Sequence, residues 1–132
     1  MSRMKMLLGM AILALMCGCA TTGGRRSVPI ENIEGCTVTV VNGQPMREII
    51  MRAAHRKLWL PQALDDHTVR CTLKLRSHQV VVDVVYTESA FSIRYVSSEN
   101  MRHDSGANTI SPKYNQWIRN LQREIVGQSL KR

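Results

Sequence analysis

The chain has 132 residues, of which 44% are hydrophobic and 5% aromatic, and its 18 Lys and Arg exceed 10 Asp and Glu to give a formal net charge of +8. A strongly basic domain is a candidate for nucleic-acid binding. Nucleic-acid modules place aromatic side chains among their cations, however, and this chain has no such motif, so its composition argues against a nucleic-acid partner.

The N-terminus has the three regions of an export signal. Residues 1–5 are basic, Met6–Met16 form an apolar run that is too short to span a bilayer, and Met16-Cys17-Gly18-Cys19 follows. This layout resembles the signal of bacterial lipoproteins, in which a small residue precedes a cysteine that receives lipid. We expect residues 1–18 to be a signal peptide that is removed. An ordinary secretory signal or an apolar N-terminus without a signal function is the alternative.

The resemblance implies where the mature protein is anchored. Cys19 is the expected lipidation site, because lipidation at Cys17 would place the bulky Met16 before the cleaved bond. The several acyl chains of a bacterial lipoprotein hold a protein firmly at a membrane. Ala20 stands where Asp would signal retention in the inner membrane of enterobacteria. We therefore expect a periplasmic domain that is anchored to the outer membrane by lipid.

Residues 19–35 are expected to be a flexible spacer, and residues 36–132 a single domain with one core. The spacer contains Thr-Thr-Gly-Gly-Arg-Arg-Ser and has little hydrophobic periodicity. Cys36 and Cys71 then remain as an even pair in an oxidising compartment, where they could form a disulfide. Cys71 also alternates with apolar residues, so it could instead be a small core residue. The sequence leaves both alternatives open.

The first half of the domain predicts a strand, a helix and an edge strand. Thr37–Val41 is β-branched, Pro45 suits the first turn of a helix, and Pro61 restricts Trp59–Leu64 to the edge of a sheet. Glu48 and Arg52 have the spacing of an ion pair within the helix. The expected buried face of this helix comprises Met46, Ile50, Ala53, Ala54 and Lys57.

Alternating apolar and polar residues then predict an antiparallel meander of three strands joined by short hairpin loops. Its strands are Thr68–Arg76, Gln79–Tyr86 and Ala90–Ser97. After a polar loop, Ser111-Pro112 predicts the start of a second helix, and Gly127 its end. The apolar stripe of that helix consists of Tyr114, Trp117, Ile118, Leu121 and Ile125. The expected fold is α+β, a small antiparallel sheet of the meander plus one or two short strands, packed against two helices in the order β-α-β-β-β-β-α.

Two segments carry a resemblance that covers about residues 44–126. They are Phe91-Ser-Ile-Arg-Tyr-Val-Ser-Ser-Glu-Asn-Met101 and the helix with Tyr114-Asn-Gln-Trp-Ile118. Together they resemble a group of small, functionally uncharacterised proteobacterial lipoproteins. The resemblance implies lipid anchoring and the α+β fold, and it carries no activity.

Local motifs for catalysis, metal binding or cofactor binding are absent from the sequence. The four histidines lack the spacing of a metal site, and Asp65-Asp66-His67 is better explained as a turn. We therefore expect no metal, no cofactor and no catalytic residue. An enzyme that acts on an envelope substrate is the alternative hypothesis, with His78, Asp83 or His103 as the acid–base group.

The candidate binding face lies on the side of the meander away from the core, where four cations accompany several valines. They are Arg70, Lys74, Arg76 and Arg94, with Val81, Val85, Val96 and Asp83 beside them. A solvated face in which Asp83 pairs with Arg94 is the simpler interpretation. Removing Arg3 and Lys5 with the signal lowers the net charge from +8 to +6, which suits anionic envelope components. The leading hypothesis is a non-enzymatic binding or scaffolding domain for an envelope protein, peptidoglycan or lipid A.

Overall fold

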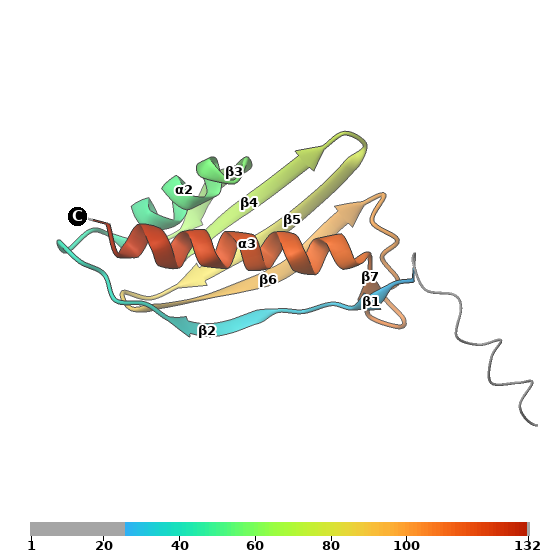
Figure 1. Ribbon diagram of the computed structural model, residues 1–132, viewed down its shortest axis with the longest axis horizontal. Coiled ribbons are helices and arrows are strands. Elements are labelled where there is room, and N and C mark those ends of the chain that lie inside the picture. The colour runs from blue at the N-terminus through green and yellow to red at the C-terminus, as the bar shows by residue number, and fades with distance from the viewer. Residues whose placement is uncertain (1–25, 132) are drawn as a thin grey trace, which may run out of the picture.

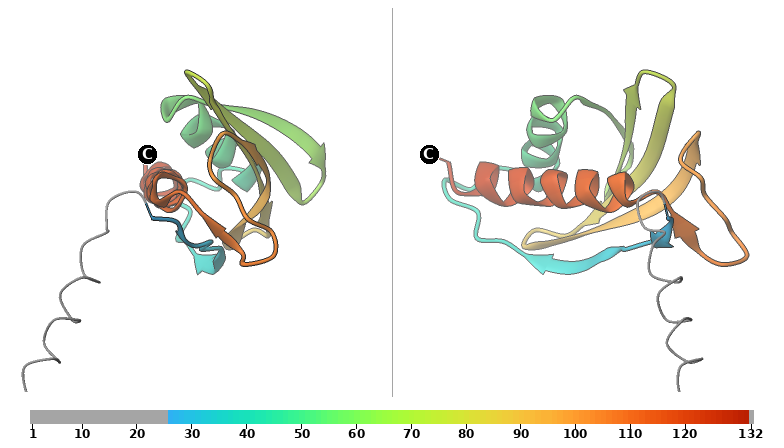
Figure 2. Two further views of the ribbon diagram at one scale, coloured as in Figure 1. Left: turned by 90° about the vertical axis from the view of Figure 1, so that its right-hand side faces the viewer. Right: turned by 45° about the vertical axis from the view of Figure 1, so that its right-hand side comes forward.

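The computed structural model describes residues 26–131, which form a five-stranded antiparallel sheet with both helices on one of its faces (Figures 1 and 2). The strand order is β2-β6-β5-β4-β3, and a two-stranded ribbon of β1 and β7 lies at one end. The strands are β1 (Val28–Pro29), β2 (Ile33–Thr37), β3 (Trp59–Asp65), β4 (Thr68–Leu75), β5 (His78–Tyr86), β6 (Ala90–Glu99) and β7 (Thr109–Ile110), and the helices are α2 (Met46–Arg56) and α3 (Pro112–Ser129). The predicted α+β class and the order β-α-β-β-β-β-α are confirmed by β2 to β6 with the two helices.

The core lies between the helices and alternate residues of the sheet. In β5, for example, Val80, Val82 and Val84 are fully buried, whereas Val81 and Val85 on the other side of the strand are half-buried. This alternation is the pattern of an antiparallel sheet that is covered on one face only. No helix among the described residues is long and apolar enough to cross a membrane.

The second helix runs along the full length of the domain. Ser111 caps it by accepting a hydrogen bond from the Lys113 amide, and Pro112 occupies its first turn, as predicted. The prediction that Gly127 ends it is wrong, because Gln128 and Ser129 are buried and extend its packed face by a further half turn. Trp117, expected in the buried stripe, is only half-buried, whereas its other four predicted members are fully buried.

Helix α2 ends at Arg56, one residue before Lys57, which was predicted to be the last residue of its buried face. Lys57 is exposed and is the residue at its C-terminal cap, so it does not belong to the buried face. The buried residues are Met46, Ile49, Ile50, Ala53 and Ala54. The chain then reverses through Leu58, whose φ of +69° is rare for a residue with a branched side chain, and enters β3.

The C-terminal part of the predicted spacer is structured. Residues 28–35 contain β1 and the start of β2, and Ile33 pairs with Ile93 of β6. The buried Asn115 side chain holds this segment, because its Oδ1 accepts from the Glu31 amide and its Nδ2 donates to the Pro29 carbonyl, both at 3.0 Å. The expected boundary at residue 36 is therefore wrong, and the domain includes this segment. Residues 19–25 of the expected spacer lie outside the described residues.

The predicted strand Thr37–Val41 is displaced toward the N-terminus. Thr37 pairs with Ala90, the first residue of β6, so the chain beyond Thr37 has no strand to pair with. The end of β2 is therefore set by the start of the neighbouring strand β6, and the β-branched residues after Thr37 do not extend it. The predicted edge strand and the meander are confirmed, with β6 extended to Glu99.

Candidate functional site

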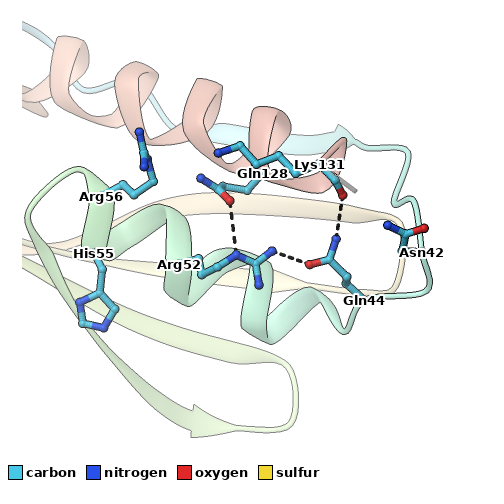
Figure 3. A pocket seen from close by; sticks show the side chains of 7 residues that line it. All are labelled: Asn42, Gln44, Arg52, His55, Arg56, Gln128 and Lys131. Atoms are coloured by element: carbon cyan, nitrogen blue, oxygen red, sulfur yellow. Dashed lines mark hydrogen bonds between the residues drawn. The ribbon is translucent and has the colours of Figure 1, made fainter.

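A cavity of about 570 Å³ lies between the two helices and the loop that joins β2 to α2 (Figure 3). The lining side chains are basic or carry a neutral amide, and none is acidic. They are Asn42 and Gln44 from the loop, Arg52, His55 and Arg56 from α2, Gln128 from the last turn of α3, and Lys131 from the residues after it. We call this set the basic cavity.

Arg52 is held at the centre of the basic cavity by two amide oxygens. Its Nε donates to Gln128 Oε1 at 3.3 Å, and its Nη2 donates to Gln44 Oε1 (Figure 3). Gln44 is fixed in turn, because its Nε2 donates to the Lys131 carbonyl at 3.2 Å. Both acceptors are neutral, so they orient the guanidinium without cancelling its charge. The predicted ion pair with Glu48 is not formed between these described residues, because Arg52 turns toward the other helix.

The carboxylate of Glu124 lies beside the basic cavity. It forms an ion pair with Arg56 at 3.1 Å and accepts a hydrogen bond from Gln128 Nε2 at 2.8 Å. The hydrogen bond from Gln128, followed by the positive charge of Arg56, lowers the pKa of Glu124 below its ordinary value. One cation of the cavity is thus neutralised in part, whereas Arg52 and Lys131 form no ion pair within the part of the chain that the structure describes.

These cations are not required to cap the C-terminus of α3. The carbonyls of Gly127 and Gln128 accept from the amides of the residues that follow the helix, and the Ser129 carbonyl accepts from the Val41 amide at 3.1 Å. Helix ends often attract Lys and Arg to such carbonyls. Here those acceptors are already satisfied, so Arg52 remains available to bind something else.

A second cavity, of about 660 Å³, lies at the other side of the start of α2 and has mixed charge. Its cation, Arg47, donates to the Tyr86 hydroxyl at 3.3 Å and lies 3.7 Å from Asp66. Glu48 and Glu88 also line this second cavity. Its acidic residues distinguish it from the basic cavity and make it the weaker candidate for an anion.

The predicted binding face is on the open side of the sheet, but two of its four cations are neutralised. Arg70 forms two hydrogen bonds to the Asp83 carboxylate, at 2.8 and 3.0 Å, and Arg94 forms two to Glu34, at 3.2 and 2.9 Å. The simpler interpretation, in which Asp83 pairs with Arg94, names the wrong partner for Asp83, which pairs with Arg70. Asp83 lies opposite both arginines in the sheet, and Arg94 pairs instead with Glu34 of the edge strand β2.

Lys74 and Arg76 lie at the far end of the same face. Lys74 is exposed on β4, and Arg76 occupies the two-residue turn to β5 with a φ of +58°. Neither forms an ion pair with another of residues 26–131. The cationic character predicted for the whole face is therefore confined to this hairpin.

The three acid–base candidates are not brought together. Asp83 is on the open face of the sheet, bound to Arg70, whereas His78 shares the parity of the buried valines on β5 and its Nδ1 lies 2.8 Å from the Asn100 carbonyl. His103 stands in the loop after β6, where its ring lies 4.7 Å from that of Tyr95. Each group has a local structural partner, and they share no lining of either cavity described above.

Cys36 and Cys71 are free thiols, so the disulfide is not formed. They lie on β2 and β4, which are separated by β6 and β5. Three strand spacings amount to about 14 Å, about twice the longest Cα separation that a disulfide spans. Cys71 is fully buried, as the alternative of a core residue required, and burial raises the pKa of its thiol to about 12.

The sequence-based prediction missed the basic cavity. The signal in the sequence is the i,i+4 spacing of Arg52 and Arg56, which places two like charges on one face of α2. The amides of Gln44 and Gln128 come from distant parts of the chain and leave no local pattern. Cys19, the predicted lipidation site, lies outside the described residues.

Comparison of the chain with protein-family models, curated proteins and solved structures finds no match. Within residues 26–131, no three His, Cys, Asp or Glu side chains are placed to hold a metal ion. Any functional conclusion therefore depends on the signal-like N-terminus and on the geometry of the basic cavity.

Proposed function

We propose that this chain is an outer-membrane lipoprotein whose periplasmic domain binds an anionic envelope component without catalysing a reaction. The binding site is the basic cavity. The observation that carries the proposal is the state of Arg52, which two neutral amides hold in a fixed orientation and which has no carboxylate partner among the described residues. A preoriented cation loses little side-chain entropy on binding, so it favours an anionic ligand.

The arrangement favours binding over proton transfer. His55 is the acid–base side chain of the basic cavity, and it points away from the Arg52 guanidinium (Figure 3). The ligand would therefore meet a cation and amides, which orient and hold a substrate but exchange no proton with it at neutral pH. The enzyme hypothesis requires an acid–base group aimed at the same point as the cation.

Mass spectrometry of protein extracted from membranes tests the anchor. The proposal predicts a chain that begins at Cys19, carries acyl groups on that residue and separates with the outer membrane on a density gradient. An intact N-terminus without acyl groups, recovered from the soluble fraction, would overturn the assignment of compartment and with it the class of partner.

Co-sedimentation with isolated cell envelopes tests the binding site. The mature chain in detergent micelles should bind, and Arg52→Gln should weaken binding by about tenfold or more, because a hydrogen bond to a charged group is worth about 1.5 to 3 kcal/mol. Lys74→Gln is the matched control, since it removes the same charge from an exposed site outside the cavity. Equal losses for the two variants would show that overall charge, and not the basic cavity, causes binding.

A further inference from the structure

Building on the proposed function, we infer that the ligand of the basic cavity is a peptide with a free carboxylate. Arg52 binds the carboxylate, and the amide side chains around it bind neighbouring peptide groups. Three features of the described residues support this chemistry: the geometry of the free donors, the charge beside them and the position of the cavity in the molecule.

The free donors of the basic cavity suit a planar carboxylate. The hydrogen bonds of Arg52 to Gln128 and Gln44 use Nε and Nη2. Nη1 is therefore the guanidinium nitrogen that can donate to a ligand. Among the residues that line the basic cavity, the side chains of Asn42 and Lys131 donate no hydrogen bond to one another or to the rest of the lining (Figure 3). A guanidinium matches a carboxylate in shape and in hydrogen-bond geometry, and an amide both donates to and accepts from a peptide group.

The negative charge beside the basic cavity neutralises only part of its positive charge. Glu124 lies at its edge, bound to Arg56 and Gln128, and the C-terminus of α3 adds the negative end of a helix dipole. Glu124 offsets the charge of Arg56, whereas Arg52 and Lys131 form no ion pair with another described residue. The basic cavity therefore keeps a net positive charge, which attracts an anion.

The basic cavity is remote from the end at which the described chain begins. β1 lies beside the start of α3, whereas the cavity lies at its other end, about 27 Å along an 18-residue helix (Figure 1). In a chain anchored through its N-terminus, the cavity thus lies at the end of α3 that is farther from the anchor. This position favours a ligand in the periplasm over the phosphate groups of the anchoring bilayer.

Calorimetric titration of the mature chain in micelles tests the inference. The probe is a mixture of N-acetylated tripeptides with free C-terminal carboxylates, compared with the same mixture amidated at the C-terminus and with inorganic phosphate. We expect the free acids to bind at least tenfold more tightly than the amides and than phosphate. Arg52→Lys should weaken this binding, because lysine keeps the charge but cannot donate to Gln44 and Gln128 and to the ligand in the same fixed orientation, and Lys74→Gln should leave it unchanged.

The outcomes separate this inference from the proposed function. If Arg52→Gln loses binding to envelopes while acids and amides bind alike, the carboxylate inference is wrong and the basic cavity remains the site. Tighter binding of phosphate than of the free acids would likewise overturn the carboxylate. If Arg52→Gln keeps full binding to envelopes, both proposals fail. Circular dichroism and the thermal midpoint of each variant verify that the domain is folded.

Discussion

The thiol of Cys71 illustrates what burial does to one residue. It is fully buried on β4, and burial, with a smaller contribution from Asp83, raises its pKa from 9.0 to about 12. The thiolate is the reactive form of cysteine. Cys71 should therefore be inert in the native protein, in contrast to the partly exposed Cys36.

Alkylation with iodoacetamide at pH 8 tests this prediction. Cys36 should be modified in the native protein and Cys71 only after unfolding in urea, as peptide mapping by mass spectrometry would show. The free energy of unfolding should also fall between pH 9 and 12, because the unfolded thiol ionises there and the folded one does not. Modification of both cysteines at similar rates without denaturant would contradict the buried position.

Tyr114 is a second buried side chain with an ionisable group. Its side chain is fully buried in α3, its ring packs edge-on against Tyr95 at 5.6 Å, and its hydroxyl has no hydrogen-bond partner among the described residues. Burial raises the pKa of this hydroxyl. Its desolvation is thus an uncompensated cost, of about 1 to 3 kcal/mol in typical proteins.

Removing the hydroxyl should therefore not destabilise the domain. Tyr114→Phe keeps the ring and should leave the free energy of unfolding unchanged or raise it by up to about 2 kcal/mol in urea titrations. Tyr95→Phe is the control, since its hydroxyl lies 2.8 Å from that of Ser98 and its loss should destabilise. A loss of stability in Tyr114→Phe larger than that in the control would indicate a partner for the Tyr114 hydroxyl.

At the scale of elements, the strongest periodic patterns predicted the fold well. The meander, the edge strand with Pro61 and the helix that begins at Ser111-Pro112 all form where the local pattern places them. The predictions that failed depend on contacts distant in sequence. Strand β2 ends where β6 begins, and β1 is held by an amide on α3, so neither is determined by its own residues alone.

Asn115 gives a direct test of that distant contact. Asn115→Ala removes both hydrogen bonds to the segment that includes β1 and should cost about 1 to 3 kcal/mol, because the Glu31 amide and the Pro29 carbonyl lose a partner that is itself buried. Hydrogen exchange should quicken in residues 28–33. Gln116→Ala, at an exposed position on the same helix, should change neither quantity. Unchanged protection of that segment in Asn115→Ala would show that the β1–β7 pairing suffices.

The basic cavity could not be predicted for the same reason. Arg52 was predicted to pair with Glu48 within its helix, whereas the fold brings Gln128, 76 residues away, to within 3.3 Å of it. The predicted outer face was recognised as a surface from strand alternation, but the partners that neutralise Arg70 and Arg94 depend on strand order. Alternation indicates which side chains share a face, and tertiary structure determines which charges remain free.

The stability of the whole molecule should depend on pH in the acid range through Glu124. Its pKa is lowered in the folded state, so its contribution to stability is complete above the ordinary value of 4.5 and is lost as the pH falls through the lowered value. Glu124→Gln should reduce this acid sensitivity in thermal scans. It should also raise the affinity for an anionic peptide at pH 7, because it removes the negative charge beside Arg52. An affinity that falls in Glu124→Gln would contradict the assigned charge balance.

Nuclear magnetic resonance titration would locate the anionic ligand, which we propose to bind between α2 and α3. The isotopically labelled mature chain in micelles would be titrated with soluble anionic fragments released from cell envelopes. We expect chemical-shift changes in the amides and side chains of the basic cavity, with the largest changes at Asn42, Gln44, Arg52 and Gln128. Shifts confined to β4, β5 and β6 on the open face of the sheet would contradict this expectation and would return the binding site to Lys74 and Arg76.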